Sequence, residues 1–243
     1  MIDKDGQLLG EKDCILKYNV QIVRKHNDIR KGFVNFILGL PEEHVLEMRD
    51  SFAVAVKAEL DWNNFYTYRP LKNTDAYIVY GGMDDGDNDA DEEDLRARST
   101  TMNFNPTRGG AFKSINTDSI VTGYDIFDLD LNMIPNSDQR KEIWFTFNYI
   151  SNFLRMPALT TDAEKRLENG VGWMQALSTA YEDNPSIDCV LYYLNNRLGD
   201  KSKTEIENIR NKAIQKFKKY PYWEYRDKQF KFSSLLDNEL PKL

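Results

Sequence analysis

The densest set of chemically active side chains is an acidic tract at residues 84–94, which holds eight carboxylates and no Lys or Arg. Carboxylates at this density can coordinate calcium, bind a basic partner or imitate the phosphate backbone of a nucleic acid. They can also repel one another and stay solvated. The eight residues are Asp84, Asp85, Asp87, Asp89, Asp91, Glu92, Glu93 and Asp94.

Part of this tract has the spacing of a calcium-binding loop. Asp87, Asp89 and Asp91 occupy the first, third and fifth positions of an EF-hand pattern. The same count places Glu92 where the loop needs glycine and Arg98 where it needs a bidentate acid. The sequence therefore favours a solvated loop or a contact surface over a specific calcium site.

A second pair of carboxylates, Asp128 and Asp130, lies two residues apart in a predicted strand at 124–131. Alternate residues of a strand share a face, so both carboxylates could reach one magnesium ion, as a nuclease requires. Asp125 or Glu142 could complete such a set. The opposite face is apolar, however, so the carboxylates are better interpreted as the solvent face of a half-buried strand. That apolar face would consist of Phe127, Leu129 and Leu131.

The best candidate for nucleic-acid or partner contact is a basic segment near the C-terminus. Its cations occupy non-core positions of a predicted helix, and an aromatic cluster follows them directly. Basic and aromatic side chains together are typical of single-strand binders, although lysines also cover the outer face of most bundle helices. The candidate contact residues are Arg210, Lys212, Lys216, Lys219 and Trp223.

Residues for nucleophilic catalysis form no recognisable pattern. His26 and His44 have no patterned Ser, Cys or Asp beside them, and Cys14 and Cys189 have neither zinc-site nor disulfide spacing. The Gly-Gly pair at 81–82 leads into the acidic tract, which would repel a phosphate. We therefore expect no cofactor, and the protein is more easily interpreted as a non-enzyme.

Charge is unevenly distributed along the 243 residues. The eight acids of the tract exceed the formal net charge of −7, while the C-terminal segment at 197–231 is basic. Such segregation favours contacts between copies, or with partners of opposite charge. The sequence has no secretory signal and no apolar run of membrane-spanning length, so we expect a cytoplasmic protein or one assembled into a virion from the cytoplasm.

The N-terminal part predicts an antiparallel helix pair. Apolar residues between 19 and 40 recur at spacings of seven and four, and a second apolar pattern runs from Pro41 to Leu60. Pro41 would take the first helical position. The main alternative for the second half of this helix is a strand at 51–56.

The middle of the chain predicts a small antiparallel sheet, with strands at 77–80, 100–104 and 124–131. The C-terminal part predicts four helices with short connections, which we expect to form a bundle. Their capping signals include Asn136, Thr161, Asn184 and Ser202. We divide the chain into 1–135 and 136–243, or treat it as one continuous domain.

These observations predict an α+β, predominantly helical protein and leave three functions open. The leading one is a non-catalytic assembly protein, of the phage or virion type that the Asn-, Asp-, Lys- and Tyr-rich composition suits, with self-association or a protein partner. The second is a regulator that binds nucleic acid or imitates it, and the third is a magnesium-dependent nuclease using Asp128 and Asp130. No membrane partner is expected.

Overall fold

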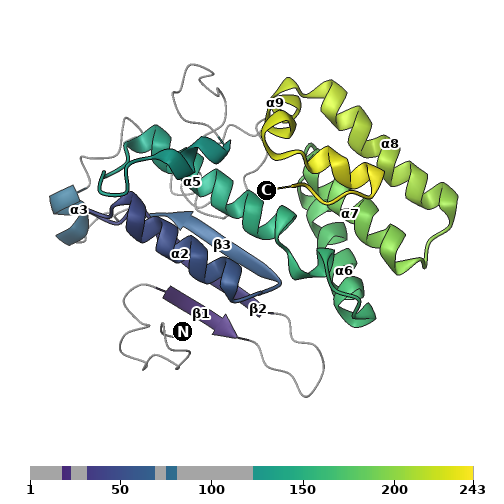
Figure 1. The fold of residues 1–243 in the computed structure, drawn as a ribbon, viewed down its shortest axis with the longest axis horizontal. Coiled ribbons are helices and arrows are strands. Elements are labelled where there is room, and N and C mark those ends of the chain that lie inside the picture. The colour runs from purple at the N-terminus through teal and green to yellow at the C-terminus, as the bar shows by residue number, and fades with distance from the viewer. Residues whose placement is uncertain (1–17, 23–31, 69–74, 81–122, 243) are drawn as a thin grey trace.

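The computed structural model describes residues 18–22, 32–68, 75–80 and 123–242, and it is predominantly helical, as the sequence predicts (Figure 1). The acidic tract, the predicted strand at 100–104, His26 and Cys14 lie outside the described residues. The first elements are β1 (Tyr18–Ile22), β2 (Gly32–Leu38), α2 (Val45–Lys57), β3 (Trp62–Thr67), α3 (Asp75–Tyr80) and the 3-10 helix η3 (Gly123–Asp128). They are followed by α5 (Ser137–Tyr149), the π-helix η4 (Ile150–Leu154), the 3-10 helix η5 (Pro157–Leu159), α6 (Glu164–Ala180), α7 (Pro185–Leu198), α8 (Lys203–Lys219), α9 (Pro221–Phe230) and the 3-10 helix η6 (Phe232–Asp237).

The described strands form one sheet in the order β1-β2-β3. β1 and β2 are antiparallel, with Tyr18 opposite Phe36, whereas β2 and β3 are parallel, with Phe33 opposite Trp62. A parallel pair needs a crossover connection, and α2 supplies it. α2 covers one face of the sheet, where its buried residues meet those of β2 and β3 in one apolar cluster.

The predicted N-terminal helix pair is wrong in its first member. Residues 19–40 contain strands β1 and β2 instead of a helix. In β2, Val34, Phe36 and Leu38 are buried at every second position, and Ile37 between them is 44% exposed. The segment is so rich in apolar residues that it also satisfies helical spacing, but β-branched and aromatic residues favour the strand.

The second member of the pair is a helix, although it starts later than predicted. α2 begins at Val45 with His44 as its N-cap, and Pro41 lies in the turn before it. The carboxylate of Glu43 accepts hydrogen bonds from the backbone N–H groups of that turn, 2.6 Å from Gly39 N. Gly39 has a φ of 77°, a left-handed conformation that glycine adopts readily. The alternative strand at 51–56 is not formed, because these residues belong to α2.

The predicted antiparallel sheet in the middle of the chain is also wrong where the structure describes it. Residues 77–80 belong to the short helix α3, and residues 123–128 form η3. Gly123 and Ile126 are buried and Leu129 packs on the same cluster, a spacing of three residues. Side chains three apart share one face of a 3-10 helix, so the apparent alternation of apolar residues was misleading.

The outer edge of β3 is covered by side chains of α5 and η4. The Asn152 amide receives a hydrogen bond from Asn63 N at 2.8 Å and donates one to Asn63 O at 2.6 Å. Asn148 does the same at Phe65, with both distances 3.1 Å. These two amides satisfy backbone groups that an edge strand would otherwise leave unpaired.

Helices α5 to α8 lie where the sequence predicts helices, whereas α9 was not predicted, and a four-helix bundle is not confirmed. Asn184 caps α7, Gly199 ends it, and Ser202 caps α8 as expected, whereas the N-cap of α6 is Ala163 and not Thr161. α7 packs between α6 and α8, while α5 packs chiefly against β3, η3 and η4. α5 contributes residues to both apolar clusters and so connects the sheet with the C-terminal helices.

Candidate functional site

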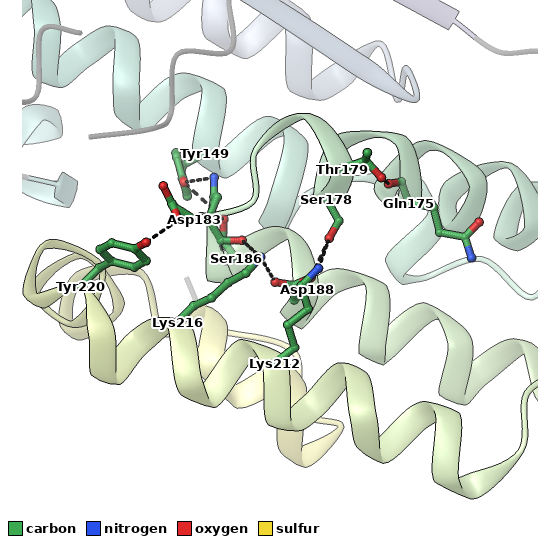
Figure 2. A network of polar contacts seen from close by, with 11 residues as sticks. Tyr149, Gln175, Ser178, Thr179, Asp183, Ser186, Asp188, Lys212, Lys216 and Tyr220 are labelled. Atoms are coloured by element: carbon green, nitrogen blue, oxygen red, sulfur yellow. Dashed lines mark hydrogen bonds and ion pairs between the residues drawn. The ribbon is translucent and has the colours of Figure 1, made fainter. Parts of the chain in front are cut away.

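A groove of about 480 Å³ opens between the C-terminal end of α6 and one face of α8 (Figure 2). Lys212, Lys216 and Lys219 lie on this face because residues four and three apart on a helix point the same way. On the other side, Glu182 and Asp183 belong to the turn that joins α6 to α7. The groove therefore has a basic wall and an acidic wall.

Beside this groove, Asp188 is a buried carboxylate on α7, with 1% of its surface exposed. It accepts a hydrogen bond from Ser178 Oγ at 2.8 Å and forms an ion pair with Lys216 Nζ. Lys212 Nζ lies 3.6 Å from Asp188 Oδ1 and 3.0 Å from Ser178 Oγ. Figure 2 shows these side chains converging from three helices. Two ammonium groups thus share one carboxylate.

Lys216 is the unusual member of this cluster, because only 7% of its surface is exposed. Burial lowers the pKa of its ammonium group, and the neighbouring Asp188 carboxylate opposes that shift. A second contact runs from Lys216 Nζ to Asn184 O at 3.5 Å. The carboxylate keeps a buried cation charged beside the groove.

A network at the start of α7 fixes the position of Asp188. The Asn184 side chain accepts a hydrogen bond from Ser186 N at 3.0 Å and donates one to Tyr149 Oη at 3.1 Å. Tyr149 and Ser186 hydroxyls are 3.2 Å apart. Burial raises the pKa of the Tyr149 phenol well above its usual value. Because α7 is capped this way, Asp188 projects one turn further along toward α8.

The acidic wall is tied to the end of α8. The Tyr220 hydroxyl donates a short hydrogen bond to Asp183, and Lys219 Nζ lies 4.9 Å from the centre of the Tyr220 ring. Glu182 is exposed at the rim. The groove is therefore a charged surface feature with a polar base.

The groove includes a serine, but its environment does not activate it. Ser178 is buried and donates a hydrogen bond to Asp188, which also contacts Lys212 and Lys216. A general base needs a free acceptor atom within hydrogen-bond reach of the proton, and both oxygens of this carboxylate already contact ammonium groups. The arrangement suits binding of charge better than attack on a substrate.

The five predicted contact residues differ in their exposure to solvent. Trp223 is completely buried and packs on Tyr149, with ring centres 5.9 Å apart. Arg210 is held by the C-terminal segment, including Asp237 at 3.5 Å. Of the five predicted residues, Lys212 and Lys219 are exposed, and Lys212 and Lys216 contact Asp188. Trp223 therefore does not offer a surface on which a base could stack.

The predicted metal pair is also not assembled. Asp125 and Asp128 lie on η3 and Asp130 in the turn after it, all exposed, so no strand face holds them together. Glu142 is bound by both terminal nitrogens of Arg226, at 2.7 and 2.8 Å. Within the described ranges, no group of three or more His, Cys, Asp or Glu residues could hold a metal ion.

Sequence reasoning found the lysines of the groove but missed Ser178 and Asp188. A signal was present, because Asp188 stands next to Ile187 and close to Val190 in the apolar stripe of a strongly patterned helix. A charged residue in such a stripe requires a buried partner. The other candidate nucleophile in the described chain, Cys189, is fully buried, and burial raises the pKa of its thiol.

None of the helices that the structure describes is long and apolar enough to cross a membrane. The chain matches no protein-family model, and no curated protein and no solved structure is significantly similar to it.

Proposed function

We propose that this chain is a non-catalytic assembly protein, of the kind that builds phage or virion particles, in which surfaces of opposite charge join copies of the chain. The observation that carries the proposal is the groove, where Lys212 and Lys216 are organised over the buried Asp188. Lysines on one wall of the groove and acids on the other offer charged contacts to a partner surface of complementary charge.

The charge distribution supports the same function. The last twelve residues of α8, 208–219, carry five Lys or Arg residues and no Asp or Glu. The acidic tract carries the complementary charge, and such pairs of surfaces favour association between copies.

The alternatives fit the geometry less well. A single-strand binder would need exposed aromatic side chains, but Trp223 is buried in the core. A magnesium nuclease would need Asp128 and Asp130 beside a third ligand, and Glu142 is already paired with Arg226. Ser178 donates its hydrogen bond to a carboxylate whose oxygens both contact lysines.

Self-association that weakens steeply with salt tests the proposal. At about 20 mM salt we expect oligomers in native mass measurements, and at about 1 M salt, where the screening length falls to about 3 Å, we expect the monomer. Replacing the tract at 84–94 by Gly and Ser should also yield the monomer at low salt.

The matched control neutralises acids that lie outside the tract. Asp125, Asp128 and Asp130 are exposed and can all be changed to Asn. This variant should still self-associate at low salt. Unchanged assembly of the tract variant, or equal loss in the control, would rule out the proposed contact. Incubation of the same control and the unmodified chain with nucleic acid and magnesium also tests for nuclease activity.

A further inference from the structure

The groove holds as many carboxylates as ammonium groups, and its two walls differ in sign. The ammonium groups are those of Lys212, Lys216 and Lys219, and the carboxylates are those of Glu182, Asp183 and, at the base, Asp188. A partner surface with one sign of charge would be attracted by one wall and repelled by the other. The groove therefore fits a surface that itself carries both signs.

At the base of the groove the charges already have partners within the chain. Asp188 contacts both Lys212 and Lys216. On the acidic wall, Asp183 accepts a hydrogen bond from the Tyr220 hydroxyl. These contacts connect α7 and the turn before it to α8, so the two walls keep their positions relative to each other (Figure 2).

The rim carries two charges that lack such partners. Glu182 and Lys219 are exposed, and among the described residues neither forms an ion pair. The residues that follow them in the chain, Asp183 and Tyr220, are bound to each other across the groove. Glu182 and Lys219 therefore stand near the same level of the groove, one on each wall.

A surface with one acidic and one basic wall is complementary to a copy of itself. A rotation of 180° about an axis along the groove places the basic wall of one copy against the acidic wall of the other, which is an isologous contact. Glu182 of each copy then meets Lys219 of the other, so the same ion pair forms twice. Because a chain cannot place its groove against itself, this contact requires a second copy.

We propose that the groove between α6 and α8 is a two-fold contact between two copies of this chain, in which Glu182 of each copy pairs with Lys219 of the other. The inference rests on the proposed assembly function. Nine residues line the groove, whereas a standard interface has about 20–30 residues a side, and exposed ion pairs are individually weak. The groove contact thus acts together with the acidic tract, and neither is expected to hold two copies alone.

Charge reversal tests the contact in the full chain with its tract intact. Glu182→Lys and Lys219→Glu should each weaken low-salt self-association by about tenfold or more, because the symmetry turns two attractions into two repulsions. An equimolar mixture of the two variants should restore association as a mixed pair, measured by native mass. In that pair the new lysine of one chain meets the new glutamate of the other, and the second ion pair is unchanged.

The mixture separates a contact between copies from a role within one chain, because charges that act only within the chain would not be restored by mixing. Lys218→Glu is the matched control, since Lys218 is exposed on α8 but does not line the groove. It should change self-association by less than about twofold. Circular dichroism establishes that all variants are folded. Folded variants that stay monomeric when mixed would overturn the two-fold contact.

Glu182→Lys also separates this inference from the function on which it rests. If the acidic tract alone joined copies through α8, removing a negative charge beside α8 would leave association unchanged or strengthen it. The two-fold contact requires the opposite. A chain that assembles normally with Glu182→Lys therefore refutes the groove contact but keeps the assembly function, whereas an unmodified chain that is monomeric even at low salt refutes both.

Discussion

At the scale of single residues, a buried, bidentate ion pair connects α9 with α5. Arg226 binds Glu142 with both terminal nitrogens, and its guanidinium carbon lies 3.9 Å from the centre of the Phe145 ring. The guanidinium group is completely buried. A planar, bidentate cation stacked on a ring is a role that lysine cannot fill. This contact fixes α9 against the helix that carries both apolar clusters.

Arg226→Met should therefore destabilise the protein by about 3–5 kcal/mol, because it leaves the Glu142 carboxylate buried without its cation. Urea unfolding followed by circular dichroism measures the loss. The double variant Arg226→Met with Glu142→Leu removes both charges and should recover most of the stability. If the double variant is as unstable as the single one, the loss comes from packing and not from an unpaired charge.

At the scale of secondary-structure elements, local signals decided what could be predicted. α7 and α8 were predicted with their caps, because Asn184, Gly199 and Ser202 act on neighbouring backbone groups. β2 was missed because its identity depends on pairing with β1 and β3, which no local pattern records. In the candidate site too, local features were predicted and contacts between elements were not. The spacing of Lys212 and Lys216 is visible within one helix, whereas their partner Asp188 comes from another.

Two glycines of α6 show how packing changes the effect of one substitution. A Cβ atom at Gly170 would lie 2.9 Å from Ala158 Cβ and 3.1 Å from Leu194 Cδ1, whereas one at Gly172 would have no neighbour within 4 Å. Gly170 is buried and Gly172 exposed. Close packing against neighbouring elements thus constrains Gly170 and not Gly172.

Gly172→Ala should stabilise the protein by up to about 1 kcal/mol, because alanine is the better helix former and meets no obstacle. Gly170→Ala should destabilise it by about 1–3 kcal/mol, because the methyl group overpacks the contact with Ala158. Both variants are compared by urea unfolding, and each is the control for the other. If both variants were more stable, helix propensity alone would determine the change in stability, and the close contact at Gly170 would have no effect.

At the scale of the whole molecule, buried aromatic residues connect the elements around α5. Burial raises the pKa of Tyr222, beside Arg226, to about 12, and that of Tyr124, which packs on Phe230, also to about 12. These phenols stay protonated in the folded protein over a range in which an unfolded tyrosine ionises. The stability of the fold is thereby linked to alkaline pH.

We expect the free energy of unfolding to fall as the pH rises from about 10 to 12, by at most about 1.4 kcal/mol per pH unit for each such tyrosine. In this range the unfolded chain binds fewer protons than the folded one, so each added pH unit favours unfolding; below about pH 10 both states keep the phenol protons. Lys216 has the opposite effect on the free energy of unfolding. Its pKa is lowered in the folded protein, so the folded protein loses this proton at a lower pH than the unfolded chain. Above about pH 10.5, the usual pKa of lysine, Lys216 no longer changes the pH dependence, and the tyrosines determine it.

Tyr124→Phe isolates one of these groups. The Tyr124 hydroxyl is buried and has no hydrogen-bond partner among the described residues, so its removal should leave stability at pH 8 unchanged or slightly higher. Urea midpoints at pH 8, 10 and 11 should then fall less steeply for Tyr124→Phe than for the unmodified chain. Identical pH dependence in the two proteins would contradict this prediction. It would show that Tyr124 ionises at the same pH in the folded and unfolded states, in spite of its burial against Phe230.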